Sequence, residues 1–418
     1  MYKIAGIDVH KKMLAVVVAD VAVDGEYCFE RRKFGTGDSE LKALAAWLAG
    51  EDVQEVVMES TAQYWRPVWR QLEQQCQLHL AQAQSNRAPR GRKRDFDDAE
   101  RLVRRLAAGE LILSFVPKPE QRLWRTLTHA RYQLTRDRVR LHSRLEAHLE
   151  DCNLKLSSCV SDLLGVSSRK MLTALADGET CPGQLAALAE RELRATPEQL
   201  ADALAAAACL GTLHREILGL YLEQITLIER QVEAIDSKLA TALKPHEEAV
   251  VRLAEVPGLG VISAQTIIAE VGPEAATFDT PEQLSSWTGT CPGREESAEV
   301  SYSDRCPKGN RMMRRVLDQA ANSAIKTKGC VFQSFYRRLM PKVGHQIAVW
   351  AVAHKICKVV WKILYQKVHY IEFGKERDAK ALKERTRKMI RQLRSMGYQI
   401  VAPPEQTKET DALVPVLG

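Results

Sequence analysis

The stretch KIAGIDVHKKMLAVVVADV, residues 3–21, contains two apolar runs separated by a short polar segment. Each run has the length and the content of Val and Ile that are typical of a buried β-strand. A turn-like VDGE follows at 23–26, and YCFERRKF at 27–34 fits a third strand. The three segments therefore predict an antiparallel meander at the start of the chain.

Helices and strands alternate after the meander. The predicted elements are a helix at 37–49, a buried strand at 53–60, a helix at 63–75 with Pro67 near its first turn, a strand at 76–83 and a helix at 95–110. Strands that first form a meander and then alternate with helices are typical of a mixed sheet with helices on its faces. We therefore predict an α/β domain over residues 1–118.

Four carboxylates fall at the ends of these elements. Asp8 ends the first apolar run and Glu59 the fourth, where a carboxylate is costly unless something pairs with it. Asp95 and Asp98 are three residues apart at a helix start and share a face. Together they would suit two Mg²⁺ ions, which prefer oxygen ligands and can stabilise an in-line phosphoryl transfer. Taken singly, each could instead be a turn residue, an ion-pair partner or a helix cap.

The stretch RAPRGRKRDFDDAERL, residues 87–102, sorts its charges sharply. Its basic residues, which directly precede the aspartates, are Arg87, Arg90, Arg92, Lys93 and Arg94. We expect the last four to bind phosphate beside the carboxylates. Asp97 lies off the shared face and is predicted to be an ordinary helix-start charge. Acidic capping of a helix start remains the competing interpretation.

Residues 119–245 have helical spacing. Leu127, Leu134 and Leu141 recur every seven residues, and a second seam advances in steps of three and four residues. That seam consists of Leu218, Tyr221, Ile225, Ile228, Val232, Ile235, Leu239 and Ala242. Heptad spacing predicts an antiparallel coiled-coil hairpin or a dimerising helix. The Ala-rich stretch 157–211 is predicted to be an inserted group of helices.

Residues 246–335 contain a second candidate site. The segment VVRLAEVPGLGVISAQTIIAEVG at 250–272 fits a helix-hairpin-helix, in which the backbone N–H groups near Gly258 and Gly260 would bind phosphate. A polar stretch at 291–310 is predicted to be mostly loop and to lead into a helix at 311–326. Four basic residues there are further candidates for phosphate binding: Lys308, Arg311, Arg314 and Arg315.

The rest of the chain is predicted to be a helical extension at 336–400, which ends in a basic helix, and a disordered tail at 401–418. The basic helix is a candidate for binding RNA or DNA, or is simply a solvated helix face. Trp65, Trp69 and Trp287 are predicted to lie in the core.

The composition describes a protein with several domains and a slightly basic charge. The chain has 418 residues, 45% of them hydrophobic, and a net charge of +7, which only weakly favours nucleic acid as a partner. Its ten cysteines include no Cys-x-x-Cys pair, so a zinc ribbon is disfavoured and we predict small core residues in a reducing cytoplasm. No stretch suggests a signal peptide or a membrane span.

Several blocks resemble those of a known family. GIDVHKK at 6–12, VVMESTAQYWRPVW at 56–69 and RDFDDAERL at 94–102 resemble the signature blocks of the DEDD-type transposases of bacterial insertion sequences. These enzymes, of the insertion-sequence 110/1111 type, are bridge-RNA-guided recombinases. VPGLGVISAQTIIAEVG, LSSWTGTCPGREESA and KGNRMMRRVLDQAA then follow in the order found in the family.

The resemblance implies a RuvC-like (RNase H-type) first domain, a coiled-coil region and a mostly α-helical transposase domain. Its acidic tetrad, which would bind Mg²⁺, falls on Asp8, Glu59, Asp95 and Asp98, and its nucleophilic serine on Ser297. The resemblance further implies a phosphoserine link to DNA, double-stranded donor and target DNA, a structured non-coding guide RNA and a place in the bacterial nucleoid. It also implies a homo-oligomer, a dimer to a tetramer, assembled through the coiled coil.

Two other functions remain open. A RuvC-like endonuclease that resembles junction resolvases would hydrolyse DNA with water and leave no protein–DNA adduct. A non-catalytic scaffold would bind nucleic acid without taking up Mg²⁺ through its carboxylates.

Overall fold

The chain forms two compact units, residues 1–117 and residues 118–418. The computed structural model describes residues 2–22, 26–60, 62–82, 86, 95–292, 295–297, 300–303, 306–372 and 379–397. The basic run at 87–94 and the tail at 401–418 lie outside these residues, so the phosphate-binding role predicted for Arg90, Arg92, Lys93 and Arg94 stays a prediction.

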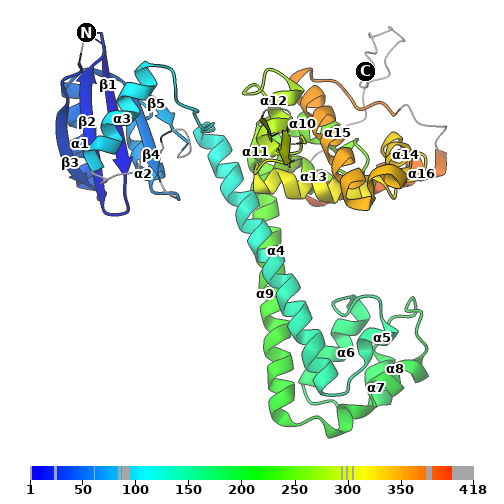
Figure 1. Cartoon of the computed structure of the whole chain (residues 1–418). Coiled ribbons are helices and arrows are strands. Elements are labelled where there is room, and N and C mark those ends of the chain that lie inside the picture. The colour runs from blue at the N-terminus through cyan, green and yellow to red at the C-terminus, as the bar shows by residue number, and fades with distance from the viewer. Residues whose placement is uncertain are drawn as a thin grey trace. The chain divides into compact units, whose positions relative to one another are not determined.

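The first unit contains a five-stranded mixed sheet in the order β3-β2-β1-β4-β5 (Figure 1). Its strands are β1 (Lys3–Val9), β2 (Met13–Asp20), β3 (Glu30–Gly35), β4 (Val53–Ser60) and β5 (Gln77–Leu80). The first three strands pair antiparallel, and β4 pairs parallel with both β1 and β5. The meander and the mixed sheet predicted from the sequence are therefore confirmed.

Helices cover both faces of this sheet. They are α1 (Asp38–Gly50), α2 (Trp65–Leu72) and α3 (Asp95–Ala107). Ala5, Ile7 and Val9 of β1 pack into the same core as the buried residues of α1 and α2. Ile4 faces the opposite side, where it packs with Leu102 of α3. Successive side chains of a strand point to opposite faces, so one strand supplies both cores.

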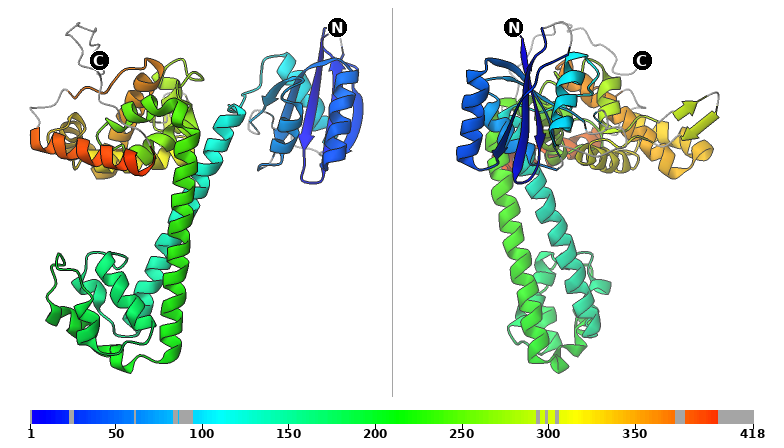
Figure 2. Two further views of the ribbon diagram at one scale, coloured as in Figure 1. Left: turned by 180° about the vertical axis from the view of Figure 1, so that it is seen from behind. Right: turned by 60° about the vertical axis from the view of Figure 1, so that its left-hand side comes forward.

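A helical hairpin begins the second unit. Its long helices are α4 (Pro119–Asp151) and α9 (Thr212–Ala242), which lie side by side (Figures 1 and 2). Arg131 pairs with Asp236, and Arg138 pairs with Glu229, so early residues of α4 meet late residues of α9. The hairpin is therefore antiparallel, as predicted, whereas supercoiling and dimerisation stay predictions.

A group of short helices is inserted between α4 and α9. They are α5 (Leu156–Cys159), α6 (Val166–Ala176), α7 (Pro182–Ala187), α8 (Pro197–Ala203) and the 3₁₀ helix η1 (Ala205–Cys209). Their buried leucines share a core with Leu145 of α4 and Leu218 of α9. This core explains why the Ala-rich stretch folds against the hairpin.

The remaining helices follow α9, and all of them except η2 share one larger core, which extends from the start of α4 and the end of α9 to Leu393. They are η2 (Lys244–His246), α10 (Glu247–Ala254), α11 (Val261–Val271), α12 (Pro281–Thr288), α13 (Arg311–Ala324), α14 (Val331–Val343), α15 (His345–Tyr365) and α16 (Ala379–Ser395). The polar stretch predicted to be mostly loop also contains a two-stranded hairpin, β6 (Glu295–Ser297) with β7 (Val300–Ser303).

The cysteines only partly match their prediction. All ten are free, but Cys330 and Cys357 alone are buried, whereas Cys28, Cys181 and Cys209 are exposed. The prediction of core residues is therefore confirmed for the two buried cysteines and wrong for the three exposed ones, while Cys76, Cys152 and Cys159 are partly buried and pack against the cores. Among the described residues, no helix has the length and apolar content needed to span a membrane.

Candidate metal and nucleic-acid site

The sheet places Asp8 beside Glu59. The two residues are direct partners in the parallel pairing of β1 with β4, and Gly6 and Val57 are paired two positions earlier. Val57 packs into the core under α3. Because side chains alternate along a strand, Asp8 and Glu59 lie on this same face. The costly carboxylates at two strand exits thus meet at one edge of the sheet.

Helix α3 brings two more carboxylates to this edge. A Cβ atom on Gly6 would lie 2.2 Å from the carbonyl oxygen of Ala99, so only glycine lets α3 approach β1 so closely. Asp95 lies about one turn before Ala99, on the same stripe of the helix. Asp95 and Asp98 are half-buried there, whereas Asp97 is exposed.

His10 connects two of the carboxylates. Its Nε2 atom lies 3.0 Å from Oδ2 of Asp8 and 3.7 Å from Oδ1 of Asp95. One potential ligand atom from each of these three side chains falls within 4.8 Å of the other two. Lys33 approaches Asp95 from β3, with Nζ 3.6 Å from Oδ2. Asp8 and Asp95 can therefore face a common cation.

Glu59 and Asp98 are connected through a second pair of residues. Asn86 donates a hydrogen bond from Nδ2 to Oε2 of Glu59 at 2.6 Å. Arg101 donates from Nε to Oδ1 of Asn86 at 3.2 Å, and it also forms an ion pair with Asp98. Asn86 is only 3% exposed, so this chain of contacts holds Glu59 and Asp98 in place from the protein side.

The electrostatics of the edge favour uptake of a cation. Burial raises the pKa of the Asp8 carboxyl; His10 acts against this, and the negative charges of Glu59 and Asp95 raise the pKa further. A raised pKa means that the nearby groups do not fully offset the free-energy cost of burying the ionised carboxylate. Four carboxylates with oxygen donors on one edge match the ligand preference of Mg²⁺, so the residues present fit this ion.

Four residues of this site were not predicted from the sequence: His10, Lys33, Asn86 and Arg101. His10 could have been predicted from the sequence, because it follows Asp8 by two positions at the end of a strand. Arg101 could also have been predicted, since it lies three residues after Asp98 on the same helix. Lys33 and Asn86 come from distant segments, and only the fold brings them to the carboxylates.

The second unit presents the other basic group. Lys308 and Arg311 are exposed at the start of α13. The guanidinium of Arg314 donates to the carbonyl oxygens of Gly289 and Pro307 and lies 4.4 Å from the centre of the Trp350 ring. Arg314 therefore braces the loop before α13, whereas Lys308 and Arg311 are open to solvent.

Arg315 belongs to a small cluster with α4. Its guanidinium lies 3.6 Å from the centre of the Tyr132 ring, and Arg136 lies on the same ring at 5.6 Å. Burial lowers the pKa of Arg315; Tyr132 acts in the opposite direction, and the charges of Arg136 and Arg131 lower the pKa further. A cluster of like charges around an aromatic ring is typical of a surface that attracts phosphate.

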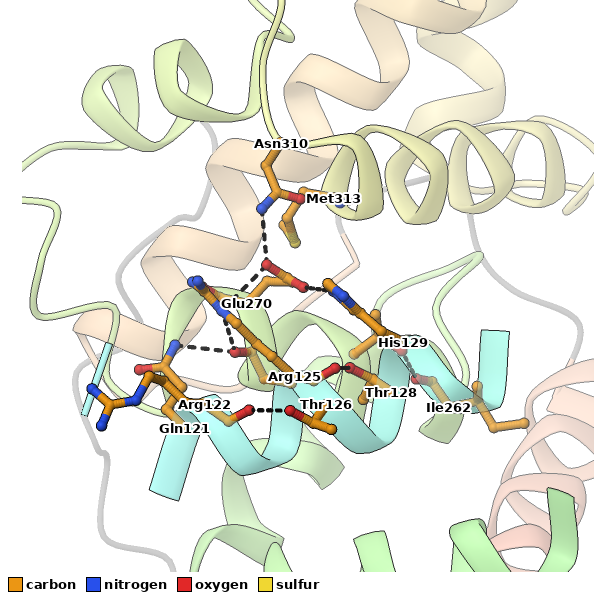
Figure 3. Close-up of polar contacts among 12 residues, drawn as sticks. Gln121, Arg122, Arg125, Thr126, Thr128, His129, Ile262, Glu270, Asn310 and Met313 are labelled. Carbon is orange, nitrogen blue, oxygen red and sulfur yellow. Dashed lines mark hydrogen bonds and ion pairs between the residues drawn. The ribbon is translucent and has the colours of Figure 1, made fainter. Parts of the chain in front are cut away.

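A buried carboxylate anchors the start of α13 (Figure 3). Glu270 of α11 is 1% exposed and receives hydrogen bonds from His129 at 2.6 Å and from Asn310 at 2.8 Å. Arg125 adds an ion pair at 3.4 Å. Asn310 is also the N-cap of α13, because its Oδ1 accepts from the backbone N–H of Met313. Glu270 thus ties α4, α11 and α13 together.

The predicted helix-hairpin-helix is formed by α10 and α11. Gly258 has a φ of +93°, and a Cβ atom there would lie 2.1 Å from the carbonyl oxygen of Ala320. Close packing on α13 is therefore enough to require this glycine. Gly260 is the N-cap of α11. Phosphate binding by this turn stays a prediction.

Ser297 ends strand β6 and pairs with Val300 of β7. Its side chain lies outside the described part of the structure, so its role as a nucleophile stays a prediction.

Two family models match the two parts of the chain that carry the candidate sites. Residues 5–154 match the transposase family model DEDD_Tnp_IS110, and residues 250–337 match that of the transposase IS116/IS110/IS902 family. The first match covers the whole carboxylate edge, and the second covers Ser297, Glu270 and the start of α13. No curated protein sequence matches the chain.

Proposed function

The chain belongs to the IS110-type DEDD transposases and is a DNA transposase, and we propose that it cuts and rejoins DNA with Mg²⁺ and a serine nucleophile. Asp8, Glu59, Asp95 and Asp98 would hold the metal, and Ser297 would attack the DNA. The observation that supports this most is the pairing of Asp8 with Glu59 under the start of α3.

The metal-binding residues have distinct roles in this proposal. When bound, Mg²⁺ would stabilise the negative charge that develops on a phosphate during its transfer. Among the described residues, Asp8 pairs with His10, and Asp95 pairs with His10 and Lys33, whose side chains are about half exposed and can move aside. Asp8 and Asp95 would therefore provide the most open ligands. Glu59 and Asp98 are held by Asn86 and Arg101, which fixes their geometry.

Ser297 would carry the covalent step. Its Oγ atom forms a bond to phosphorus while the bond from phosphorus to one deoxyribose oxygen breaks. The serine loses its proton and the leaving oxygen gains one, so the charge is balanced. Attack by a hydroxyl group of another DNA end on the phosphoserine then releases the serine and rejoins the strand. Because a serine hydroxyl is a weak nucleophile at neutral pH, a base or a metal ion must activate it for its attack on the DNA.

The nucleic-acid partners would be double-stranded donor and target DNA and a structured non-coding RNA that selects them. The solvent-open cations Lys308 and Arg311 and the Arg315 cluster support a phosphate-binding surface in the second unit. Arg90, Arg92, Lys93 and Arg94 would serve the carboxylate edge in the same way. The protein would assemble as a dimer to a tetramer through α4 and α9.

A suicide DNA substrate tests the serine step. We expect the full-length protein, with its RNA and Mg²⁺, to form a protein–DNA adduct that is lost in Ser297→Ala and kept in Ser303→Ala of the same hairpin. An adduct that survives in Ser297→Ala would contradict the serine assignment. Free DNA ends without an adduct, unaffected by Ser297→Ala, would identify a nuclease that uses water.

A further inference from the structure

Three side chains with nitrogen and sulfur donors meet at the end of the α4–α9 hairpin next to the inserted helices. His148 and Cys152 lie one helical turn apart at the end of α4, and His214 lies in the first turn of α9. One potential ligand atom from each falls within 4.8 Å of the other two. This cluster is made only of residues of the second unit and is separate from the carboxylate edge.

The hydrogen bonds of the cluster leave at least one nitrogen or sulfur atom free on each of the three side chains. Nε2 of His148 lies 2.9 Å from the carbonyl oxygen of His214. A carbonyl only accepts, so Nε2 carries the proton and the Nδ1 lone pair of a neutral ring stays unprotonated. Metal-binding histidines commonly donate their second N–H to a backbone carbonyl in this way. In the described part of the chain, neither Sγ of Cys152 nor the ring nitrogens of His214 have a hydrogen-bond partner.

We propose that His148, Cys152 and His214 bind Zn²⁺. One thiolate and two imidazoles are the donors that Zn²⁺ prefers, whereas Mg²⁺ prefers oxygen ligands. Three protein ligands leave the fourth tetrahedral position to water, which the exposure of His214 allows. The sequence did not reveal this site, because its ligands lack a Cys-x-x-Cys pair and come from two helices that meet only in the fold.

The bound ion would fasten the hairpin where the inserted helices begin. Cys152 is the C-cap of α4, and it packs against the core of the inserted helices. The ion would therefore link the end of α4 to the start of α9 and stabilise this end of the hairpin.

Cobalt substitution tests the site in the full-length protein. We expect metal-free protein to bind Co²⁺ with a thiolate-to-cobalt charge-transfer band, which Zn²⁺ abolishes and excess Mg²⁺ does not. Cys152→Ser should remove the band, and the control Cys159→Ser should keep it. His148→Ala should weaken binding by more than the roughly 10–100-fold typical of losing a residue that only orients a ligand, whereas His142→Ala, also on α4, should not.

Alkylation tests the site without any variant. Zn²⁺ should slow the labelling of Cys152 in the native protein, as followed by mass spectrometry, and should leave the labelling of Cys159 unchanged. The proposal is overturned if wild type gives no charge-transfer band, if Cys152→Ser keeps the band, or if Zn²⁺ leaves the labelling of Cys152 unchanged. These readouts require no DNA and do not depend on the proposed recombinase chemistry.

Discussion

Asp8 in the first unit and Glu270 in the second are both carboxylates held away from solvent, but their surroundings shift the pKa of the carboxyl group in opposite directions. Burial raises the pKa of Asp8, and the nearby Glu59 and Asp95 raise it further despite His10. Burial also acts to raise the pKa of Glu270, but the bonds from His129, Arg125 and Asn310 outweigh it and hold this pKa below its usual value.

The difference separates a site that needs a ligand from a group that already has its partners. Glu270 is more deeply buried than Asp8, so depth alone does not decide the direction of the shift. What decides it is the charge of the neighbours, which is mostly negative around Asp8 and positive around Glu270. Removing Asp8 should therefore affect activity, and removing the charge of Glu270 should affect folding.

The largest effect is expected from Asp8→Asn. Loss of a metal ligand should remove several kcal/mol of transition-state stabilisation, a fall in DNA cleavage of about 10³-fold. The midpoint temperature of thermal unfolding should be unchanged or slightly higher, because one of several crowded negative charges is removed. Cleavage assays and calorimetry of the same preparations would check this, with Asp38→Asn as a surface control. Full activity of Asp8→Asn would refute the metal site.

A loss of folding stability is expected from Glu270→Gln. The change removes the charge from a buried ion pair and should lower the free energy of unfolding by about 3 kcal/mol. The matched control is Glu282→Gln, which breaks the exposed pair with Lys358 and should cost less than about 1 kcal/mol. Urea unfolding measures both. Equal values for the two variants would show that the Glu270 contacts do not stabilise the fold.

The stability contributed by Glu270 should depend on pH. Its pKa is lowered in the folded state, so its contribution is fully present above the ordinary value of 4.5. It is then lost as the pH falls through the lowered pKa. The stability difference between wild type and Glu270→Gln should be constant near neutral pH and shrink below about 4.5. A difference that grows on acidification would have the wrong sign for this account.

Gly6→Ala should damage the carboxylate edge indirectly. The new Cβ would clash with the Ala99 carbonyl oxygen, push α3 away from β1 and separate Asp95 from Asp8. The free energy of unfolding should fall by about 1–3 kcal/mol. The rate of DNA cleavage should also fall, because the carboxylates would no longer lie close together. Gly50→Ala is the control, since nothing lies within 4 Å of its new Cβ. A Gly6→Ala protein with normal stability and activity would show that the close approach of α3 is not needed.

The smallest effect is expected from Asp97→Asn. Asp97 is exposed and lies off the stripe of α3 that carries Asp95 and Asp98. A surface substitution of this kind should change stability by less than about 0.5 kcal/mol and leave cleavage nearly intact. Asp98→Asn should impair cleavage strongly. Comparable losses in the two variants would show that the helix register is assigned incorrectly.

Much of the first unit could be predicted from the sequence because its signals are local. The strand 53–60 was predicted with the bounds it has, since its apolar run ends at Glu59 and Ser60. The proximity of Asp8 and Glu59 followed from the ends of neighbouring strands. Asn86 and Lys33 could not be found this way, because their contacts depend on loops and strands distant in sequence.

The second unit was less predictable. The hairpin of α4 and α9 followed from heptad spacing, but Glu270 gave no signal, because an isolated glutamate in an apolar helix does not reveal its partners. Arg314 is predicted to bind phosphate, which stays a prediction, and its Nη1 atom already donates to carbonyl oxygens of the preceding loop. Charge in a sequence shows which residues can bind phosphate, and only the fold shows which of them are already engaged.

Titration of Mg²⁺ into the protein–DNA complex tests the central claim, that the edge formed by Asp8, Glu59, Asp95 and Asp98 takes up the metal. Isothermal calorimetry should show saturable Mg²⁺ binding to the wild-type complex and its loss in Asp8→Asn, with DNA binding retained. Equal Mg²⁺ uptake by the wild type and Asp8→Asn, or none by the wild type, would contradict the account.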